Sequence, residues 1–325
     1  MTTTKKVLIT GAPGQMAHYC AKILNKQGHE VTLTYNSSPD IDVPDEVHQV
    51  QLDITDTEAV GNLISSQQYD EIFNFAAMSD PRHCSALPLD AIQVNVLGIT
   101  NILEAVHRHC NHDPTVVQAV SEYQLNCSSL YGLTKSMSTD ITMYYRENHL
   151  INAYCVILPH CESPRRGKNF FIGKLLRWMK GLRSIIEEAG VKEEDFEFST
   201  DEIMVIHHNE IVWRYPKIRL GNLYKKMSWI SVPDALSMII HYINEVDRSP
   251  VFTIDRGIYV DCAEIMDNLM SKAGFKLNWS KYYVFDNSLN KQNSEVNLDW
   301  EPECLDVEGN IDSLISFLLA EEDPL

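Results

Sequence analysis

The chain has 325 residues, a formal net charge of −18 at pH 7 and an apolar fraction of 44%. This length exceeds what one small core needs and predicts one large α/β domain or two domains. The apolar fraction is typical of a globular chain, and we expect no apolar run long enough to span a bilayer. The negative charge argues against a nucleic-acid partner, because the phosphate backbone would be repelled.

The N-terminus and the cysteines predict a cytoplasmic protein. The first residues lead directly into a strand-like segment at 7–10, with no secretory apolar region and cleavage site. Eight cysteines are scattered without a CxxC pair, which is typical of reduced thiols. His107, Cys110 and His112 lack a matching second half, so we expect no metal site there.

A glycine-rich turn follows the first expected strand and precedes a helical pattern. Gly11 and Gly14 allow the backbone to approach a pyrophosphate closely. The start of the helix, at Gln15 and Met16, offers unpaired N–H groups and the positive end of a dipole. This order of strand, turn and helix predicts dinucleotide binding, and a tight turn without a ligand is the alternative.

The second expected strand, residues 29–35, ends at Asn36 and Ser37, where the cofactor ribose should lie. An acidic residue there favours NAD, and an arginine favours the 2′-phosphate of NADP. This chain has neither at these two positions. Both cofactors therefore stay open, with NADP taken first and NAD as the alternative.

Two later strand ends complete the expected cofactor site. Asp53 and Ile54 follow a third strand and can hold the adenine edge, while a helix N-cap is the alternative for this segment. Ala76 and Ala77 follow a fourth strand at 71–75, and their small side chains would let the backbone lie against the cofactor.

Tyr131 and Lys135 fall in the first turn of an expected helix, after an apolar strand that ends at Ser121 and Glu122. Residues four apart share one helical face, so the phenol and the ammonium can point into the same cleft. An ammonium beside a phenol favours the phenolate and lowers its pKa from roughly 10. Such a base can take a proton from a hydroxyl while a hydride leaves the same carbon. An ordinary amphipathic pair is the alternative.

These motifs resemble those of the extended short-chain dehydrogenases/reductases, and specifically of the GDP-mannose 4,6-dehydratase family. The resemblance covers most of the chain. It is carried by the segments 11–15 (GAPGQ), 74–77 (NFAA), 94–98 (VNVLG), 131–135 (YGLTK), 162–167 (ESPRRG) and 220–223 (LGNL). The glycine turn and the tyrosine–lysine pair occur in a very broad superfamily, whereas the last two segments are much narrower.

The resemblance implies an α/β fold of the extended Rossmann type, a doubly wound parallel sheet with a smaller α/β substrate domain. We expect the sheet in residues 1–160 and 228–256. The remaining segments, 161–227 and 257–325, would form the substrate domain, with an insertion at 187–217. We also expect a homodimer or homotetramer that takes a GDP-sugar.

The resemblance also implies a reaction. Tyr131, helped by Lys135, would deprotonate the C4 hydroxyl of the sugar during its oxidation. Glu122 would then remove the C5 proton and protonate the departing C6 hydroxyl. The family has a threonine where Val120 stands, for which Ser121 could substitute, and a longer loop before the tyrosine.

Because oxidation at C4 does not need Glu122, other functions stay open. A C4 dehydrogenase, reductase or epimerase on a related GDP-hexose or heptose is one alternative. A non-catalytic cofactor-binding paralogue is another.

The substrate-binding residues implied by the resemblance lie in the second half of the chain. They are His160, Glu162, Arg166, Asn169, Lys174, Asn222 and Lys226. His160 replaces a family asparagine, and a structural histidine is the alternative. Seven basic residues between Arg165 and Arg183, with no acid among them, predict where a diphosphate is held. A solvated basic helix face is the alternative to that interpretation.

Overall fold

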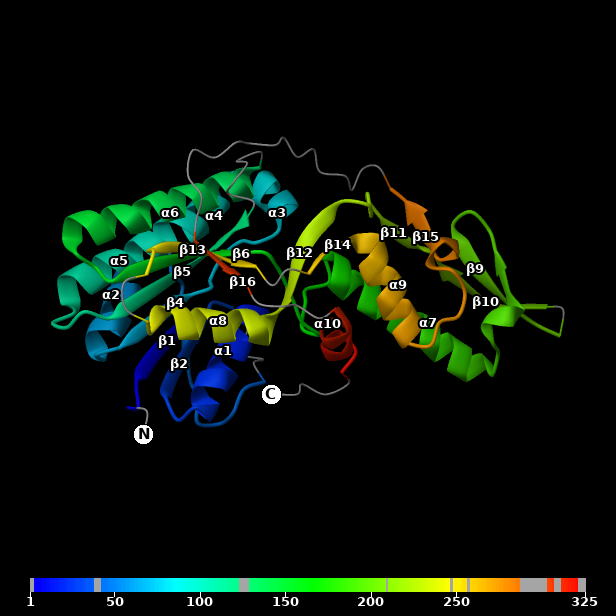
Figure 1. The fold of residues 1–325 in the computed structure, drawn as a ribbon, viewed down its shortest axis with the longest axis horizontal. Coiled ribbons are helices and arrows are strands. Elements are labelled where there is room, and N and C mark those ends of the chain that lie inside the picture. The colour runs from blue at the N-terminus through cyan, green and yellow to red at the C-terminus, as the bar shows by residue number, and fades with distance from the viewer. Residues whose placement is uncertain are drawn as a thin grey trace.

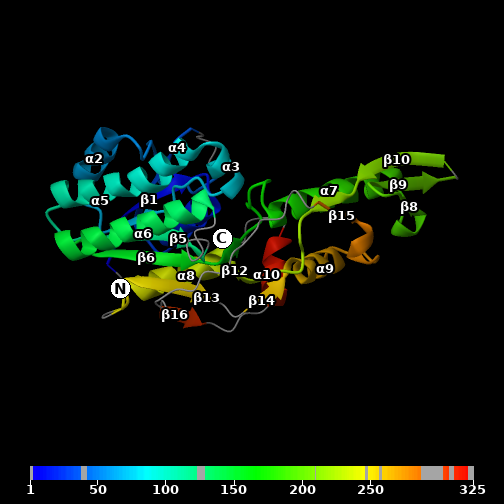
Figure 2. The ribbon, with the colours of Figure 1, turned by 90° about the horizontal axis from the view of Figure 1, so that it is seen from above.

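The computed structural model describes residues 3–37, 42–122, 129–208, 210–245, 248–255, 258–286, 303–306 and 311–320. The chain forms a large lobe around a parallel sheet and a smaller lobe around the helices α7 (Phe171–Ala189) and α9 (Cys262–Lys272) (Figure 1). Seen from above, both lobes follow one long axis (Figure 2).

The large lobe contains an eight-stranded sheet in which every neighbouring pair of strands is parallel. In spatial order the strands are β16 (Glu303–Asp306), β13 (Val251–Asp255), β6 (Ala153–Leu158), β5 (Thr115–Ser121), β4 (Glu71–Asn74), β1 (Lys6–Ala12), β2 (Glu30–Tyr35) and β3 (His48–Gln51). Chain order reverses between β1 and β4, and ligands bind beyond the carboxyl ends of strands at such a reversal.

Helices cover both faces of this sheet, which confirms the predicted doubly wound fold (Figures 1 and 2). One face carries α1 (Gln15–Lys26) and α8 (Val232–Ile243), which pack on each other and on the sheet. The other carries α2 (Thr57–Ser66), α5 (Gly98–His109) and α6 (Leu130–His149). Because both faces are buried, the central strands are nearly continuous apolar runs.

A helical segment from Pro88 to His109 precedes β5. It comprises α4 (Pro88–Ile92), the π-helical turn η1 (Gln93–Leu97) and α5. By length and composition alone it could cross a membrane, contrary to the expectation from the sequence, but 56% of its apolar window is buried inside the structure. Gly98 lies so near Ile54 that an added Cβ would be 2.3 Å from the Cδ1 of that side chain. This packing is that of a core helix.

The small lobe packs α7, α9 and α10 (Ile311–Leu318) against short strands. Those strands are β7 (His160–Glu162), β8 (Phe196–Phe198), β9 (Glu202–His207), β10 (Glu210–Pro216), β11 (Ile218–Leu220), β12 (Lys226–Ser231), β14 (Tyr259–Asp261) and β15 (Tyr283–Phe285). Single 3-10 turns lie at η3 (Glu193–Asp195) and η4 (Trp279–Lys281). Within the predicted insertion, β9 and β10 form the expected hairpin, and β8 adds a third antiparallel strand.

The position of β16 differs from the predicted division into domains. β16 pairs in parallel with β13 and so belongs to the large sheet, although residues 257–325 were assigned to the substrate domain. The added strand covers an edge of β13 that would otherwise expose unpaired backbone groups. The following helix, α10, packs against α9 in the small lobe, so the chain crosses between the lobes once more.

Candidate active site

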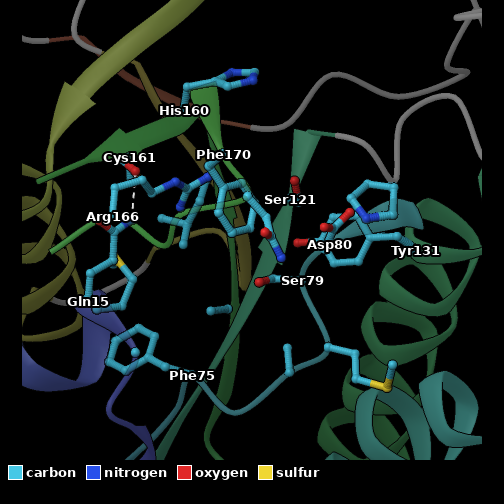
Figure 3. A pocket seen from close by; sticks show the side chains of 18 of the residues that line it. Gln15, Phe75, Ser79, Asp80, Ser121, Tyr131, His160, Cys161, Arg166 and Phe170 are labelled. Carbon is cyan, nitrogen blue, oxygen red and sulfur yellow. Dashed lines mark hydrogen bonds between the residues drawn. The ribbon is translucent and has the colours of Figure 1, made fainter. Parts of the chain in front are cut away.

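A cleft of about 950 Å³ lies where the carboxyl ends of the central strands face the small lobe. The predicted site residues that line it are Gly11, Gly14, Gln15, Met16, Asn36, Asp53, Ile54, Ala76, Ala77, Ser121, Glu122, Tyr131, Lys135, His160, Glu162, Arg166, Asn169, Lys174 and Asn222. Figure 3 shows Ser121 and Tyr131 on one side, and Gln15, Cys161 and Arg166 on the other. The fold therefore brings the cofactor motif, the tyrosine–lysine pair and the substrate segments to one place.

Two predicted residues are not part of the lining. Ser37 follows Asn36, which does line the cleft, at the end of β2. Lys226 is exposed at the start of β12, where its backbone lies opposite that of Asp261 in the antiparallel strand β14. Its neighbour Lys225 lines the cleft instead, because successive residues of an extended chain face opposite ways.

The glycine turn has the geometry that a dinucleotide needs. Gly11 has a φ of +101°, and an added Cβ would lie 2.6 Å from the backbone nitrogen of Ala76. Gly14 is the N-cap of α1 and supplies no capping side chain, so the first N–H groups of α1 open onto the cleft. An uncapped helix N-terminus at a cleft suits the pyrophosphate of NAD or NADP.

The side chain of Gln15 faces the substrate side. Its Nε2 donates a 2.7 Å hydrogen bond to the carbonyl of Cys161, and its Oε1 accepts one of 2.7 Å from the Ser163 hydroxyl (Figure 3). Gln15 thus ties the cofactor turn to β7. The side chain of Gln15 is therefore held by the substrate lobe, while its backbone N–H lies at the start of α1, which refines its predicted role.

The segment after β3 both caps a helix and lines the cleft. Asp56 is the N-cap of α2 and accepts hydrogen bonds from two backbone N–H groups of its first turn. Asp53 lines the cleft, where its carboxylate is held by the N–H and the hydroxyl of Thr55 at 2.9 and 2.8 Å. One aspartate therefore starts the helix and the other lines the cleft, and its contact with an adenine edge stays a prediction.

Tyr131 and Lys135 share the face of α6 that meets the cleft, as their spacing predicts. Ser129 caps the N-terminus of this helix, because its hydroxyl accepts a hydrogen bond from the N–H of Gly132. The Nζ of Lys135 lies 6.0 Å from the centroid of the Tyr131 ring and donates a 2.9 Å hydrogen bond to the carbonyl of Ala119. Burial lowers the pKa of Lys135 to about 8, so the ammonium is charged at neutral pH.

Asn95 lies in the π-helical turn η1, within the segment 94–98 that carries the resemblance. Its Oδ1 accepts the N–H of Met78 at 2.8 Å. Its Nδ2 donates to the carbonyl of Met78 and to the hydroxyl of Thr134, at 3.1 and 3.0 Å. This buried amide joins the loop after β4 to the turn of α6 that carries Tyr131, so it fixes both walls of the cleft.

Glu122 and His160 meet at the substrate side of the cleft. Oε1 of Glu122 lies 2.9 Å from Nδ1 of His160, and the imidazole lies 5.2 Å from the Trp229 indole, centroid to centroid. Glu122 is therefore more than a surface carboxylate, because it faces an ionisable partner inside the cleft.

A second acid–base pair lies beside the first. Glu162 is 2% exposed, and its Oε2 lies 3.3 Å from Nε of Arg166. Burial raises the pKa of Glu162, while the charges of Arg166 and His160 oppose the rise. The guanidinium also stacks 3.8 Å from the centroid of the Phe170 ring. Arg166 is thus held from two sides.

The basic run predicted to hold a diphosphate divides between two faces. Of its seven members only Arg166 and Lys174 line the cleft. Arg177, Lys180 and Arg183 are exposed along α7, so the solvated helix face is the correct interpretation for them.

Arg82, in the helix α3 (Pro81–Ala86), is a further residue of the cleft that no motif in the sequence indicates. Arg82 lines the cleft, and its Nη2 lies 3.5 Å from the Asn169 carbonyl. Burial and the charge of Arg82 lower the pKa of Lys174. Two cations from different lobes therefore face one region of the cleft, which suits a diphosphate.

Comparison with known proteins defines the family. The model of the NAD dependent epimerase/dehydratase family matches residues 7–254. The chain belongs to this family. It is 29% identical to the GDP-mannose 4,6-dehydratase of Yersinia enterocolitica over 309 residues, 85% of this chain and 74% of that protein. It is 27% identical to the GDP-mannose 4,6-dehydratase of Vibrio cholerae over 310 residues, with the same two shares.

Solved structures of two epimerases share the fold. The UDP-glucose 4-epimerase of Thermotoga maritima superposes with a TM-score of 0.73 at 13% identity, over 96% of this chain and 97% of that one. The UDP-glucose 4-epimerase of Thermus thermophilus, in complex with NAD, gives 0.70 at 14% identity, over 98% and 100%. At these identities the likeness concerns the fold.

One departure of this epimerase/dehydratase lies at the end of β5. Val120 is 2% exposed and packs with Cys155 and Ile157. As a valine it has no hydroxyl to offer to a substrate oxygen. Ser121, the next residue, lines the same cleft and carries the nearest hydroxyl in the sequence. Tyr131, Ser121 and Ser79 are among the hydroxyl-bearing residues that line the cleft.

Proposed function

We propose that the protein is a 4,6-dehydratase of a GDP-sugar, GDP-mannose or a close relative, that works with tightly held NADP or NAD. The observation that carries the proposal is the convergence of Tyr131, Lys135 and Glu122 on one cleft. The uncapped start of α1 lies at one end of that cleft, and paired cations lie at the other. The GDP-mannose 4,6-dehydratases that the chain matches over 85% of its length support the choice of substrate.

The chain's own residues can carry each proton transfer. The nicotinamide cofactor supplies a hydride acceptor and donor. Tyr131 takes the proton of the C4 hydroxyl, and the nearby ammonium of Lys135 stabilises the phenolate form of this base. The C4 ketone acidifies the C5 proton, which Glu122 removes. Glu122 then gives this proton to the C6 hydroxyl, which leaves as water.

NADP is our first choice of cofactor, with NAD as the alternative. β2 ends at Tyr35, and residues 35–37 carry no acidic side chain. The backbone carbonyl of Asn36 already accepts a 2.9 Å hydrogen bond from Nε2 of Gln51. A ribose 2′-phosphate would therefore meet no carboxylate from these three residues. The mass of the nucleotide that co-purifies with the protein tests this choice.

Arg82, Arg166, Lys174 and Lys225 are the side chains that we assign to the diphosphate, because all four line the same cleft. The guanidinium groups can bind two oxygens at once, whereas the lysines act as point charges. In a chain of net charge −18, a cluster of this kind provides a local site for an anionic ligand.

Incubation with GDP-mannose followed by mass spectrometry tests the reaction. A product lighter by one water supports the dehydratase. An unchanged mass with an altered sugar would indicate an epimerase, and a product lighter by two hydrogens with reduced cofactor would indicate a dehydrogenase. These C4 enzymes are the second candidate, because oxidation at C4 needs Tyr131, Lys135 and the cofactor but does not need Glu122. No change of any kind would favour a non-catalytic paralogue.

We further propose a cytoplasmic homodimer. Its support is a group of exposed apolar side chains on α4 and α6, two helices in mutual contact. The group comprises Leu89, Ile92, Leu133 and Met137. Light scattering of the wild type and of a Leu89→Asp variant tests it, and we expect the variant to be monomeric.

A further inference from the structure

The Glu122–His160 pair joins the two lobes. Glu122 follows β5 of the large sheet, and His160 begins β7, which pairs with β12. The two side chains are 34% and 16% exposed, so they are partly shielded, and both line the cleft. An ion pair in such a place is less screened than one at the open surface.

The ring is held more firmly than the carboxylate. His160 lies opposite Trp229 in the strand pairing and contacts its indole. The next charged groups on its own side are Glu162 and Arg166, which pair with each other at 3.3 Å. Glu122, in contrast, follows the last residue of its strand. A contact with a fixed ring therefore restrains a side chain that strand pairing does not hold.

We propose that His160 is the positioning residue that orients the Glu122 carboxylate for proton transfer at C5. This inference rests on the proposed function. With Oε1 against the imidazole, Oε2 is the oxygen left to face the sugar. The 2.9 Å between Nδ1 of His160 and Oε1 of Glu122 is a hydrogen-bond distance, and catalytic hydrogen bonds commonly tighten when substrate is bound.

The proton balance closes without another donor. Oε2 takes the C5 proton while the C–H electron pair forms the enolate of the C4 ketone. The enolate then expels the C6 hydroxyl, so a C5–C6 double bond forms as the C6–O bond breaks. Glu122 returns its proton to the leaving oxygen, water departs, and the carboxylate is restored. The imidazole keeps its own proton on Nδ1 throughout.

The test separates the two chemical steps. Holoenzyme is mixed with GDP-mannose, nicotinamide absorbance follows C4 oxidation, and mass spectrometry follows water loss. We expect His160→Leu to slow water loss by about 10- to 100-fold more than it slows oxidation, which is part of the 10²–10⁴ that a positioned proton carrier contributes. Glu122→Gln serves as the reference for complete loss of elimination.

His160→Asn is the matched variant, because its amide can donate from the position of Nδ1 without a titrating ring. It should recover most of the water-loss rate, which a role in packing alone would not predict. Unchanged water loss in His160→Leu would overturn the proposal. An equal slowing of both steps would do so too, because it would indicate a general defect of binding or folding.

A second measurement needs no substrate. In protein labelled with ¹⁵N-histidine, the His160 ring should be protonated at Nδ1. Glu122→Ala should change that resonance, whereas Glu58→Ala on the distant α2 should not. A His160 spectrum indifferent to Glu122→Ala would contradict the ion pair. If wild type fails to act on GDP-mannose, the proposed function falls and this role with it. A failure confined to the His160 variants overturns the role alone.

Discussion

The two halves of the cleft are built by different means. The cofactor half is backbone: Gly11 and Gly14 shape a turn, and the start of α1 provides N–H groups. The substrate half is side-chain charge, arranged as the pairs Glu122–His160 and Glu162–Arg166. Steric fit therefore determines which ligand the cofactor half accepts, and electrostatics determines which ligand the substrate half accepts.

This difference explains where the chain departs from its relatives. A backbone cradle changes only at a high steric cost, so its sequence signature persists. Side-chain pairs can be exchanged one at a time, and His160 stands where the resembled family has an asparagine. We therefore expect C4 chemistry to be the more constant property of this cleft, and the handling of the C5 proton and of the diphosphate to be the more individual one.

The largest expected effect is that of Tyr131→Phe, because it removes the base shared by every catalytic interpretation. C4 oxidation should slow by about 10²–10⁴-fold, while cofactor content stays unchanged. Tyr145→Phe on the same helix is the control, since its hydroxyl bonds Glu104 at 2.8 Å away from the cleft. Nicotinamide absorbance after addition of GDP-mannose measures both, and full activity in Tyr131→Phe would refute the catalytic assignment.

Gly11→Ala tests the backbone half. The added Cβ would lie 2.6 Å from the nitrogen of Ala76 at a φ of +101°. Left-handed strain costs about 1–2 kcal/mol, and overpacking adds about 1–3 kcal/mol. Gly28→Ala, with a φ of +86° and no atom within 4 Å of the Cβ, isolates the strain alone. Urea unfolding should show the larger loss for Gly11→Ala, which should also lose its cofactor. Equal losses would mean that close approach is unimportant.

The sequence predicted the cofactor half well because its signals are local. A strand, a glycine turn and a helix are contiguous between Lys6 and Lys26, and the tyrosine–lysine spacing places both side chains on one helix turn. Each of these elements specifies its geometry within about twenty residues. Asn95, by contrast, could only be described as polar, since its partners Met78 and Thr134 are set by tertiary packing.

Most members of the substrate half were predicted, but Arg82 and the pairing of the side chains were not. Arg82 comes from a short helix far in sequence from Lys174, so no spacing indicated their proximity. For the basic run, too many residues were assigned to the cleft. The sequence does not tell on which side of α7 a basic side chain lies until the buried face of that helix is known. β16 escaped assignment for a related reason: a four-residue strand is recognisable only beside its partner β13.

Lys135 tests the comparison from another side, because its ammonium is a buried charge next to the cofactor half of the cleft. Its pKa is about 8 in the folded protein, against 10.5 when solvated. Between these values the unfolded chain holds a proton that the folded chain has lost, so stability rises with pH. Below pH 8 both states are protonated and the full cost of burial applies. The gain, from a pKa difference of about 2.5, amounts to about 3 kcal/mol.

The measurement is urea unfolding at several pH values, for wild type and for Lys135→Met, in protein freed of nucleotide. Buried thiols act in the opposite direction: burial raises the pKa of Cys155 and of Cys161 to about 12, so they lower stability as the pH rises. The difference between wild type and variant cancels the contribution of Cys161, whereas Cys155 interacts with Lys135 and its contribution cancels only in part. That difference should grow from pH 8 to 10.5 in favour of wild type, and parallel curves would contradict a depressed lysine.

Arg82→Gln should have the smallest effect and tests the charge-built half. Its side chain is 57% exposed, so losing one charge-assisted contact to a diphosphate should cost about 1 kcal/mol, which raises KM for GDP-mannose about fivefold. The value of kcat should stay unchanged, because the residue lies away from the reacting carbons. Arg177→Gln, exposed on the outer side of α7, controls for net charge. Raising the salt concentration should shrink the difference between Arg82→Gln and wild type, since screening weakens exposed contacts. An effect of equal size in both variants would mean that the overall field, and not this position, attracts the substrate.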